Sequence, residues 1–283
     1  MSIPDSEASR KKLRPFLRWA GGKQGLIKHL LKSIPPDFDE NGNTYYEPFL
    51  GAGSLFLTLL PGKAVLSDLN EHLIHCFKTI RDNPETFYRY CKEHVNKTSK
   101  EYYYEIRDEF NRNINRFDIK QAARFLYLNR SSFNGIFRVN QGGQYNVPYG
   151  MGKIVTIPSR EEINQLSCNL KYVDMISASY EQILPRVRKD DFVYIDPPYP
   201  PINGTSYFTH YTKERFNIDD QKNVAIFANR LDRIGCRVLI SNADLQEIRE
   251  LYKRWNMMKI EVTRFITCKS IRYKIGELII TNY

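Results

Sequence analysis

The stretch FVYIDPPY, residues Phe192 to Tyr199, joins four apolar or aromatic residues directly to an acidic turn that contains two prolines. A short apolar run that ends at a turn is typical of a strand buried on both faces of a sheet. In an open parallel sheet, ligands bind beyond the carboxyl ends of the strands. We therefore expect Asp196, which follows the last residue of this strand, to lie at a ligand-binding edge.

Strand and helix patterns alternate along much of the chain, and this alternation predicts an α/β fold with a mainly parallel sheet covered on both faces. The last two strands have no helical pattern between them, so we expect an antiparallel hairpin at one edge. Residues 70–130 are helical throughout and predict an insertion. The expected strands are Tyr45-Tyr46, Ala64–Asp68, Lys171–Ile176, Phe192–Ile195, Arg237–Ser241, Lys259–Arg264 and Glu277–Thr281, and two expected helices are Ile218–Arg233 and Leu245–Arg254.

The tetrapeptide Asp196-Pro197-Pro198-Tyr199 suits the methylation of an amino group on a planar base. Such a nitrogen is a poor nucleophile because its lone pair is delocalised into the ring. The Asp196 carboxylate and the Pro197 carbonyl can accept both amino hydrogens and stabilise the positive charge that develops on the nitrogen. The two prolines stiffen the turn, and Tyr199 offers a flat face for an extruded base. A rigid turn without catalytic function is the alternative interpretation.

Two further segments have features of a cofactor site. Gly51-Ala52-Gly53 lies between a strand and a helix, where backbone N–H groups can approach a nucleotide-like cofactor, and Asp68 ends the next strand, where it can accept hydrogen bonds from ribose hydroxyls. The third glycine of the full dinucleotide pattern is absent, so a tight turn is the alternative. In Phe16–Lys23, Lys23 could pair with a ligand carboxylate and Trp19 could cover a sulfonium group, although a lead-in to a helix fits as well.

The formal net charge of +10 favours a polyanionic partner, because cationic side chains release counterions from phosphates. A basic protein without a nucleic-acid partner would explain the charge alone equally well. Five scattered cysteines without a C-x-x-C pair argue against disulfides and structural zinc and favour the cytoplasm. No stretch approaches the roughly 20 apolar residues that cross a membrane. The clustered cations are Arg10, Lys11, Lys12, Arg14, Arg18, Arg124, Arg130 and Arg138.

The end of the insertion has the pattern of a β-hairpin over Phe133–Val147, with Gln141-Gly142-Gly143 as its turn. A two-stranded ribbon can enter the major groove and present side chains to base edges, while neighbouring cations hold phosphates. We therefore expect this hairpin to read DNA. A basic surface hairpin is the alternative interpretation.

Five segments resemble the motifs of the Dam-type (D12 class, alpha group) DNA adenine-N6 methyltransferases, both in their residues and in their order along the chain. The resemblance extends from about Leu13 to Tyr283. It implies a Rossmann-like seven-stranded methyltransferase fold, S-adenosylmethionine as methyl donor, double-stranded DNA as partner, base flipping and direct in-line transfer. The five segments are Phe16–Lys23, Glu47–Gly53, Ser67–Asn70, Asn129–Gly150 and Asp196–Tyr199.

The expected organisation is a catalytic domain of residues 1–70 and 165–283, with a mostly helical target-recognition domain of residues 71–164 that carries the hairpin at about 133–147. The resemblance also assigns roles to matching positions. The catalytic residues are Asp196, Pro197, Pro198 and Tyr199; the cofactor-binding residues are Trp19, Lys23, Phe49, Gly51, Gly53, Asp68, Tyr180 and Asp196; the DNA-binding residues are Arg130, Asn134, Arg138, Asn140, Gln144, Asn146 and Pro148; the loop expected to close over the flipped base includes Phe208, Thr209 and Tyr211; no metal ligand is expected.

The target sequence is expected to be GATC, with one departure from the family pattern. Family members that read GATC often carry Arg or Lys in the hairpin turn, where this chain has Gln141-Gly142-Gly143-Gln144. A guanine-reading cation is then either missing or supplied by Arg138. We expect a monomer, which could act on the site of a cognate restriction endonuclease.

Four other functions are alternatives to DNA adenine methylation. A nicotinamide-dependent oxidoreductase gives no reason for Asp196-Pro197-Pro198-Tyr199, and a metal-dependent nuclease lacks a Glu-x-Lys motif. An amino-methyltransferase acting on RNA or on protein glutamine typically has Asn-Pro-Pro-Tyr. A catalytically inactive DNA-binding repressor stays open, because sequence alone does not exclude it.

Overall fold

The computed structural model describes residues 13–150, 155–200, 216–265 and 272–283. The N-terminal cations Arg10, Lys11 and Lys12 and the loop residues Phe208, Thr209 and Tyr211 lie outside the described residues. Within those residues, no helix is both long and apolar enough to cross a bilayer.

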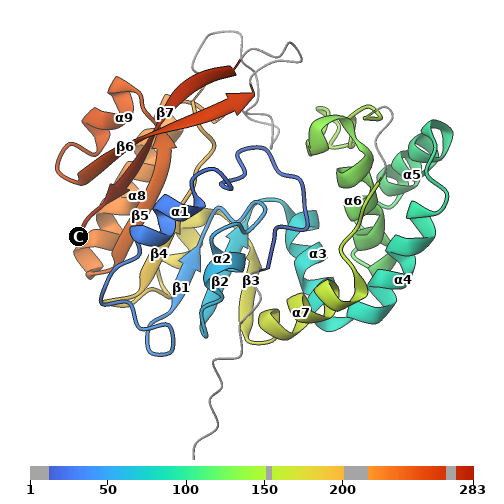
Figure 1. Ribbon diagram of the computed structural model, residues 1–283, viewed down its shortest axis with the longest axis horizontal. Coiled ribbons are helices and arrows are strands. Elements are labelled where there is room, and N and C mark those ends of the chain that lie inside the picture. Colours follow the sequence, from blue (N-terminus) through green and yellow to red (C-terminus); the bar gives the residue numbers. More distant parts are fainter. Residues whose placement is uncertain (1–12, 151–154, 201–215, 266–271) are drawn as a thin grey trace, which may run out of the picture.

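A seven-stranded sheet forms the centre of the protein, with the strand order β3-β2-β1-β4-β5-β7-β6 (Figure 1). The first five strands of this order run parallel, whereas β7 is antiparallel to both β5 and β6. The predicted seven-stranded α/β fold and its terminal antiparallel hairpin are therefore confirmed. The strands are β1 Tyr45–Glu47, β2 Ala64–Asp68, β3 Val173–Ser177, β4 Phe192–Ile195, β5 Arg237–Ala243, β6 Asn256–Phe265 and β7 Arg272–Thr281.

Several helices begin at residues whose side chains cap them. Asn70, Ser99 and Asp118 each accept a hydrogen bond from a backbone N–H in the first turn of the helix that follows, which satisfies a donor that the helix itself leaves free. The helices are α1 Ile27–Lys32, α2 Phe56–Leu59, α3 Glu71–Asp82, α4 Pro84–Val95, α5 Lys100–Arg112, α6 Ile119–Ser131, α7 Arg160–Leu170, α8 Ile218–Ile234 and α9 Gln246–Leu251, with 3-10 turns at Phe133–Gly135 and Tyr180–Ile183.

Both faces of the sheet are buried, because successive side chains of each strand point to opposite sides. Tyr45 belongs to the core on one face and its neighbour Tyr46 to the core on the other. The first core also contains Phe77 of α3, and the second contains Phe227 of α8. The near-continuous apolar strands of the sequence follow from this two-sided burial.

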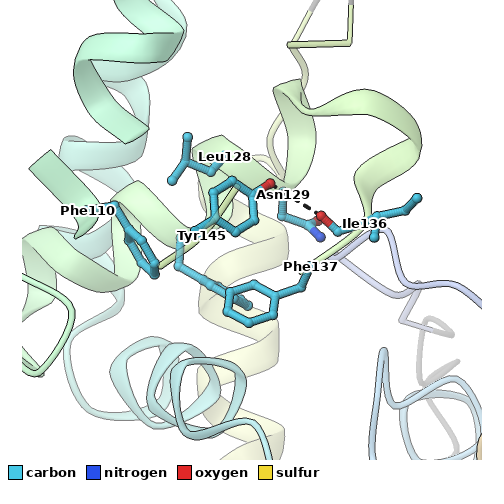
Figure 2. A pocket seen from close by; sticks show the side chains of 7 residues that line it. Phe110, Leu128, Asn129, Ile136, Phe137 and Tyr145 are labelled. Atoms are coloured by element: carbon cyan, nitrogen blue, oxygen red, sulfur yellow. Dashed lines mark hydrogen bonds between the residues drawn. The ribbon is translucent and has the colours of Figure 1, made fainter. Parts of the chain in front are cut away.

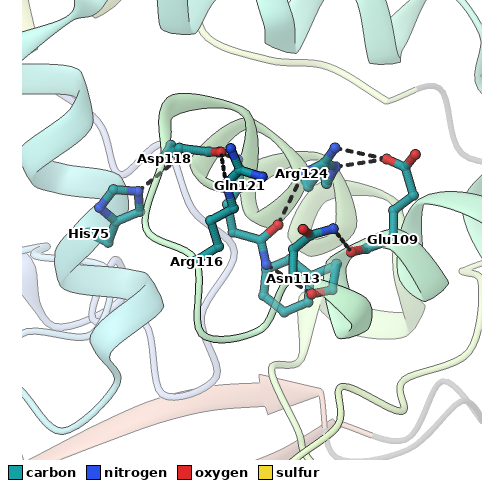
Figure 3. Close-up of polar contacts among 8 residues, drawn as sticks. His75, Glu109, Asn113, Arg116, Asp118, Gln121 and Arg124 are labelled. Carbon is teal, nitrogen blue, oxygen red and sulfur yellow. Dashed lines mark hydrogen bonds and ion pairs between the residues drawn. The ribbon is translucent and has the colours of Figure 1, made fainter.

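Helices α4, α5 and α6 lie to one side of the sheet, beyond α3 and α7 (Figure 1). Polar contacts join α5 and α6 to each other and to α3 near the N-terminus of α6 (Figure 3). Arg124 of α6 forms an ion pair with Glu109 of α5 at 2.9 Å, and the Gln121 amide donates to the Phe110 carbonyl at 2.9 Å. The ring of His75, on α3, lies 2.9 Å from the carbonyl oxygen of Asp118. These contacts connect the α5–α6 pair to the helix that packs on β2 and β3.

The predicted hairpin at 133–147 forms around its turn but not at its start. The Asn140 N–H donates to the Gln144 carbonyl at 2.8 Å and the Asn146 N–H to the Arg138 carbonyl at 3.1 Å, on either side of the bridge between Val139 and Tyr145. The 3-10 turn at Phe133–Gly135, with Asn134 at φ +55°, interrupts the first predicted strand. Asn111 of α5 binds the outer edge of the hairpin: it accepts from the Tyr145 N–H at 2.8 Å and donates to the Tyr145 carbonyl at 3.0 Å. We call residues 133–149 the recognition loop.

Asn129, at the end of α6, connects three segments of the chain. It is buried, and its side chain accepts from the Arg18 N–H at 2.8 Å and donates to the carbonyls of Arg18 at 2.7 Å and Gly135 at 3.0 Å. The amide therefore holds the N-terminal segment and the recognition loop against α6.

We expect Asn129→Ala to lower the free energy of unfolding by about 3 kcal/mol, because buried backbone groups lose their partners. Urea denaturation measures this loss. The control is Asn164→Ala, whose amide contacts Glu85 at the surface and whose removal should cost less than about 0.5 kcal/mol. Equal losses in the two variants would contradict the connecting role of Asn129.

Candidate active site

The switch point of the sheet lies between β1 and β4. The chain runs from β1 outward to β2 and β3 and then returns to β4 on the other side of β1. Ligands of open α/β sheets bind in the crevice at the carboxyl ends of the strands at such a point. Phe49 follows β1 and Asp196 follows β4, so both candidate residues lie at this edge.

The Asp196 carboxylate has a partner on each oxygen. Its Oδ2 lies 2.7 Å from Nζ of Lys23, and its Oδ1 accepts a hydrogen bond from the Ser241 hydroxyl at 2.7 Å. The Lys23 side chain is only 5% exposed and the Asp196 side chain 19% exposed, and Lys23 also donates to the Gly21 carbonyl at 2.6 Å. The structure thus brings two predicted site residues together in a nearly buried ion pair, an arrangement that sequence analysis did not predict.

Burial raises the pKa of Asp196, while the Lys23 ammonium and the Ser241 hydroxyl act in the opposite direction. A second carboxyl lies nearby on β1. Glu47 is buried and accepts from the Tyr45 hydroxyl at 2.7 Å and the Phe56 N–H at 3.3 Å. Burial raises the pKa of Glu47 to about 8, against the opposing effect of the Tyr45 hydrogen bond. At neutral pH, Glu47 therefore favours the protonated form.

The turn after Asp196 is held by residues from α8 and β7. The Gln221 amide donates to the Pro198 carbonyl at 2.8 Å, and the Tyr199 hydroxyl donates to Glu277 at 3.0 Å. The Lys23 ammonium lies 4.6 Å from the centre of the Tyr199 ring. The structure therefore brings both Tyr199 and Asp196 against one cation, Lys23.

The glycine turn after β1 carries the second part of the site. Gly51 and Gly53 both have positive φ, +48° and +66°, and a Cβ on Gly51 would lie 2.9 Å from Cδ1 of Trp19. The Asp68 carboxylate accepts from the N–H groups of Gly51 at 3.0 Å and Asn70 at 2.9 Å. Burial raises the pKa of Asp68, and these two N–H groups oppose the rise. A carboxylate has about four acceptor sites, so Asp68 keeps acceptor capacity for a ligand.

An aromatic pair lies beside the glycine turn. The rings of Phe49 and Tyr180 stack with centroids 5.1 Å apart and planes 25° apart. Tyr180 begins the 3-10 turn that follows β3, so the same edge of the sheet presents an aromatic pair and, at the end of β2, the carboxylate of Asp68. This set of groups fits an adenosine: apolar faces for the base and acceptors for the ribose hydroxyls.

The DNA-reading candidates lie mainly on the recognition loop, where Asn134, Arg138, Asn140, Gln144 and Pro148 are exposed and Asn146 is half-buried. Arg138 donates to the Asn146 side chain at 2.8 Å, so these two candidates lie together. Arg130 is placed differently. Its guanidinium donates to the carbonyls of Thr156 at 2.7 Å and Phe16 at 3.4 Å, and burial lowers its pKa.

Trp19 connects the recognition loop to the glycine turn. Its ring stacks on Phe137 of the loop, with centroids 6.3 Å apart and planes 17° apart, and also contacts Gly51. Figure 2 shows residues that line a mainly apolar pocket between the recognition loop and helices α5 and α6. Its lining residues are Phe110, Phe125, Leu128, Asn129, Ile136, Phe137 and Tyr145.

The seven-stranded sheet, with an Asp-Pro-Pro-Tyr turn at its switch point, defines the class of protein: an enzyme with a Rossmann-like methyltransferase fold. The D12 class N6 adenine-specific DNA methyltransferase family matches residues 19–266, and the chain belongs to this family. The predicted family and enzyme class, an adenine-specific DNA methyltransferase, are therefore confirmed.

Relatives match over nearly their whole length. A Type II methyltransferase of Lactococcus lactis subsp. cremoris is 41% identical over 276 residues, with 96% of each chain covered. A Type II methyltransferase of Methanocaldococcus jannaschii is 37% identical, with 96% of this chain and 99% of the relative covered. The DNA adenine methylase of Escherichia coli (strain K12) is 34% identical, with 95% of each chain covered.

Sequence analysis missed the residues that support the Asp-Pro-Pro-Tyr turn. Ser241 and Asn242 could have been found, because Ser241 ends the predicted strand Arg237–Ser241, Asn242 follows it, and carboxyl ends of parallel strands meet at one edge. Glu47 directly follows the predicted strand Tyr45-Tyr46 and precedes the glycine turn. Gln221 and Glu277 carry no such signal, because helix α8 and the antiparallel β7 bring them to the turn.

We expect Glu47→Gln to change how stability depends on pH. The folded-state pKa of Glu47 is raised from 4.5 to about 8, so its contribution is fully present below pH 4.5 and is lost as the pH rises through 8. Glutamine keeps an acceptor oxygen and does not titrate. Relative to the variant, the wild type should lose on the order of 4 kcal/mol of unfolding free energy between pH 4.5 and 9. Denaturation across this range measures the difference, and a constant difference would contradict the buried, protonated carboxyl.

Proposed function

We propose that this DNA adenine methyltransferase transfers a methyl group from S-adenosylmethionine to N6 of a flipped adenine at the end of β4. The observation that carries the proposal is the Asp196 carboxylate. It lies at the switch point of the sheet, at the start of a proline-locked turn, with Lys23 and Ser241 fixing its two oxygens. An acceptor held in this way suits an amino group that develops positive charge.

The cofactor site in this proposal consists of Trp19, Lys23, Phe49, Gly51, Gly53, Asp68, Tyr180 and Asp196. S-adenosylmethionine would supply an electrophilic methyl group on a sulfonium. Asp68 would accept hydrogen bonds from the ribose hydroxyls, and the stacked Phe49 and Tyr180 rings would contact the adenine of the cofactor. Lys23 would serve both the donor's carboxylate and Asp196, and Trp19 would cover the glycine turn.

The target base would be held by the turn itself. The Asp196 carboxylate and the Pro197 carbonyl would accept the two hydrogens of the adenine amino group, which draws the nitrogen toward tetrahedral geometry. Tyr199 would stack on the base after it leaves the duplex. The nitrogen would then attack the methyl carbon in line as the carbon–sulfur bond breaks, the donor would leave as a neutral thioether, and one amino proton would pass to the solvent. No covalent bond to the protein is needed.

DNA recognition is assigned to residues 71–164, and catalysis to residues 1–70 and 165–283. The exposed side chains of the recognition loop would contact base edges and phosphates, with Arg138 as the candidate guanine reader because its hydrogen-bonding partner Asn146 orients it. Arg130 would support the loop through its backbone contacts. We propose GATC as the site, methylation by a monomer in the cytoplasm, and a cognate restriction endonuclease acting on the same sequence.

The assignment of the acceptor is tested by Asp196→Asn and Asp196→Ala. Removing one preorganised electrostatic group at a reacting centre costs about 10²- to 10³-fold in turnover, so we expect kcat to fall by at least about 100-fold in both variants. Transfer of labelled methyl groups to plasmid DNA measures kcat, and DNA binding with thermal unfolding serves as the control for folding. Normal turnover in either variant would exclude Asp196 as the acceptor.

The proposed target sequence is tested by mapping the methylated positions in DNA. Sequencing of plasmid DNA after incubation with S-adenosylmethionine should find N6-methyladenine within GATC, and methylation confined to another sequence would overturn that target.

The logarithm of the DNA association constant should fall linearly with the logarithm of salt concentration, because phosphate contacts release counterions. A flat salt response would contradict the role of the basic surface.

A further inference from the structure

We propose that Gln221, Asn242, Ser241 and Glu277 form a positioning network that fixes the geometry of the Asp-Pro-Pro-Tyr turn for transfer. The inference rests on the proposed function and extends it to residues outside the motif. All four side chains are at most 1% exposed. Polar groups buried this completely are tolerated only when they are hydrogen-bonded, and here each of the four residues makes a hydrogen bond to the turn or to another member of the network.

The first part of the network is a relay from β5 to the second proline. The Asn242 amide donates to the Gln221 side-chain oxygen at 2.9 Å, and the Gln221 amide donates to the Pro198 carbonyl at 2.8 Å. The Ala243 N–H donates to the Asn242 side-chain oxygen at 2.8 Å. Because this N–H occupies the oxygen of Asn242, its amide must face Gln221, and Gln221 must then present its own amide to Pro198. The orientation of both amides is therefore determined by the backbone.

The relay acts on the part of the turn that matters for the amino group. The ring of Pro198 already fixes its φ angle, and a hydrogen bond to the Pro198 carbonyl fixes the next peptide plane. The Pro197 carbonyl, one peptide earlier, is then constrained between this anchored group and Asp196. A proline turn lacks the N–H groups that would otherwise hold it, so Gln221 supplies the missing restraint.

The second part of the network holds the two ends of the turn. Ser241 donates to Asp196 at 2.7 Å, and its oxygen lies 2.9 Å from the Tyr194 hydroxyl. Glu277 accepts from the Tyr199 hydroxyl at 3.0 Å. Neighbouring residues of a strand point to opposite faces, so Ser241 and Asn242 reach the turn from the two sides of the sheet. Glu277 lies beside them, since β7 pairs it with Ala243.

The decisive variants are Gln221→Glu and Asn242→Asp, each nearly isosteric with the native residue. The first puts an acceptor against the Pro198 carbonyl; the second removes the donor that orients Gln221. Because a displacement of about 1 Å at a reacting centre can cost about 100-fold in rate, we expect kcat to fall about 30-fold in both. KM for DNA and for S-adenosylmethionine should change less than about threefold, because the network contacts neither ligand.

The matched control is Asn282→Asp, at the opposite end of β5. Asn282 accepts from the Val238 N–H at 2.8 Å and donates to the Cys236 carbonyl at 2.9 Å and to the Asp232 carboxylate at 2.6 Å, so the change removes a donor to the residue directly before β5. We expect lower stability and a kcat within about twofold of the wild type. Equal changes in kcat for Asn242→Asp and Asn282→Asp would reduce the network to a structural role and overturn the proposal. If Gln221→Glu does not fold, Gln221→Met is measured against the same criterion.

A pH profile separates positioning from packing. Because the Ser241 hydroxyl lowers the pKa of Asp196, Ser241→Ala should raise that pKa and move the acidic limb of the kcat profile to higher pH. Ser241→Thr keeps a hydroxyl, so its acidic limb should lie at the same pH as that of the wild type. An unshifted limb in Ser241→Ala would contradict the role of Ser241. Failure of the proposed function is distinguishable, since the wild type would then transfer no methyl group to adenine.

Discussion

The ion pair between Lys23 and Asp196 is the contact on which the site depends. A carboxylate at the end of a buried strand is costly to desolvate unless a cation and hydrogen bonds compensate it, and the compensating ammonium comes from a segment far away in the chain. That segment also carries Trp19 over Gly51 and Arg18 onto Asn129. One short stretch, residues 18–23, therefore joins the Asp-Pro-Pro-Tyr turn, the glycine turn and the recognition loop.

The Lys23 ammonium lies near two carboxyls, those of Asp196 and Glu47, and stabilises the negative charge of one more than that of the other. Lys23 contacts Asp196 directly, while Glu47 lies in the core behind it, hydrogen-bonded to Tyr45 and to the backbone. The carboxyl with the cation holds its charge better, and the one with neutral partners favours its proton. The negative charge is thereby concentrated on the group that faces the proposed substrate. Two carboxyls with different environments can thus serve different purposes at the same pH.

The sequence predicted the strands and the acidic turn well because their signals are local. The apolar runs that became β2 and β4 were found with their observed bounds. The hairpin was predicted from its local turn, and the chain pairs around that turn, whereas the 3-10 turn at Phe133–Gly135 interrupts its first strand. The Lys23–Asp196 pair was missed because the two residues lie far apart in the sequence. Alternation and turn chemistry indicate the local structure of a segment, but they do not indicate which distant side chains it contacts.

The switch point also separates two groups of residues within the site. Residues suited to a nucleotide cofactor, Phe49, Gly51 and Asp68, follow β1 and β2 on one side. The residues that hold the Asp-Pro-Pro-Tyr turn come from β5, β7 and α8 on the other side. The sheet fixes the distance between these two halves, so a donor held by one half and a base held by the other would meet in a defined geometry. The proposed transfer in a single direct step would require this alignment, because the protein itself would form no bond to the methyl group.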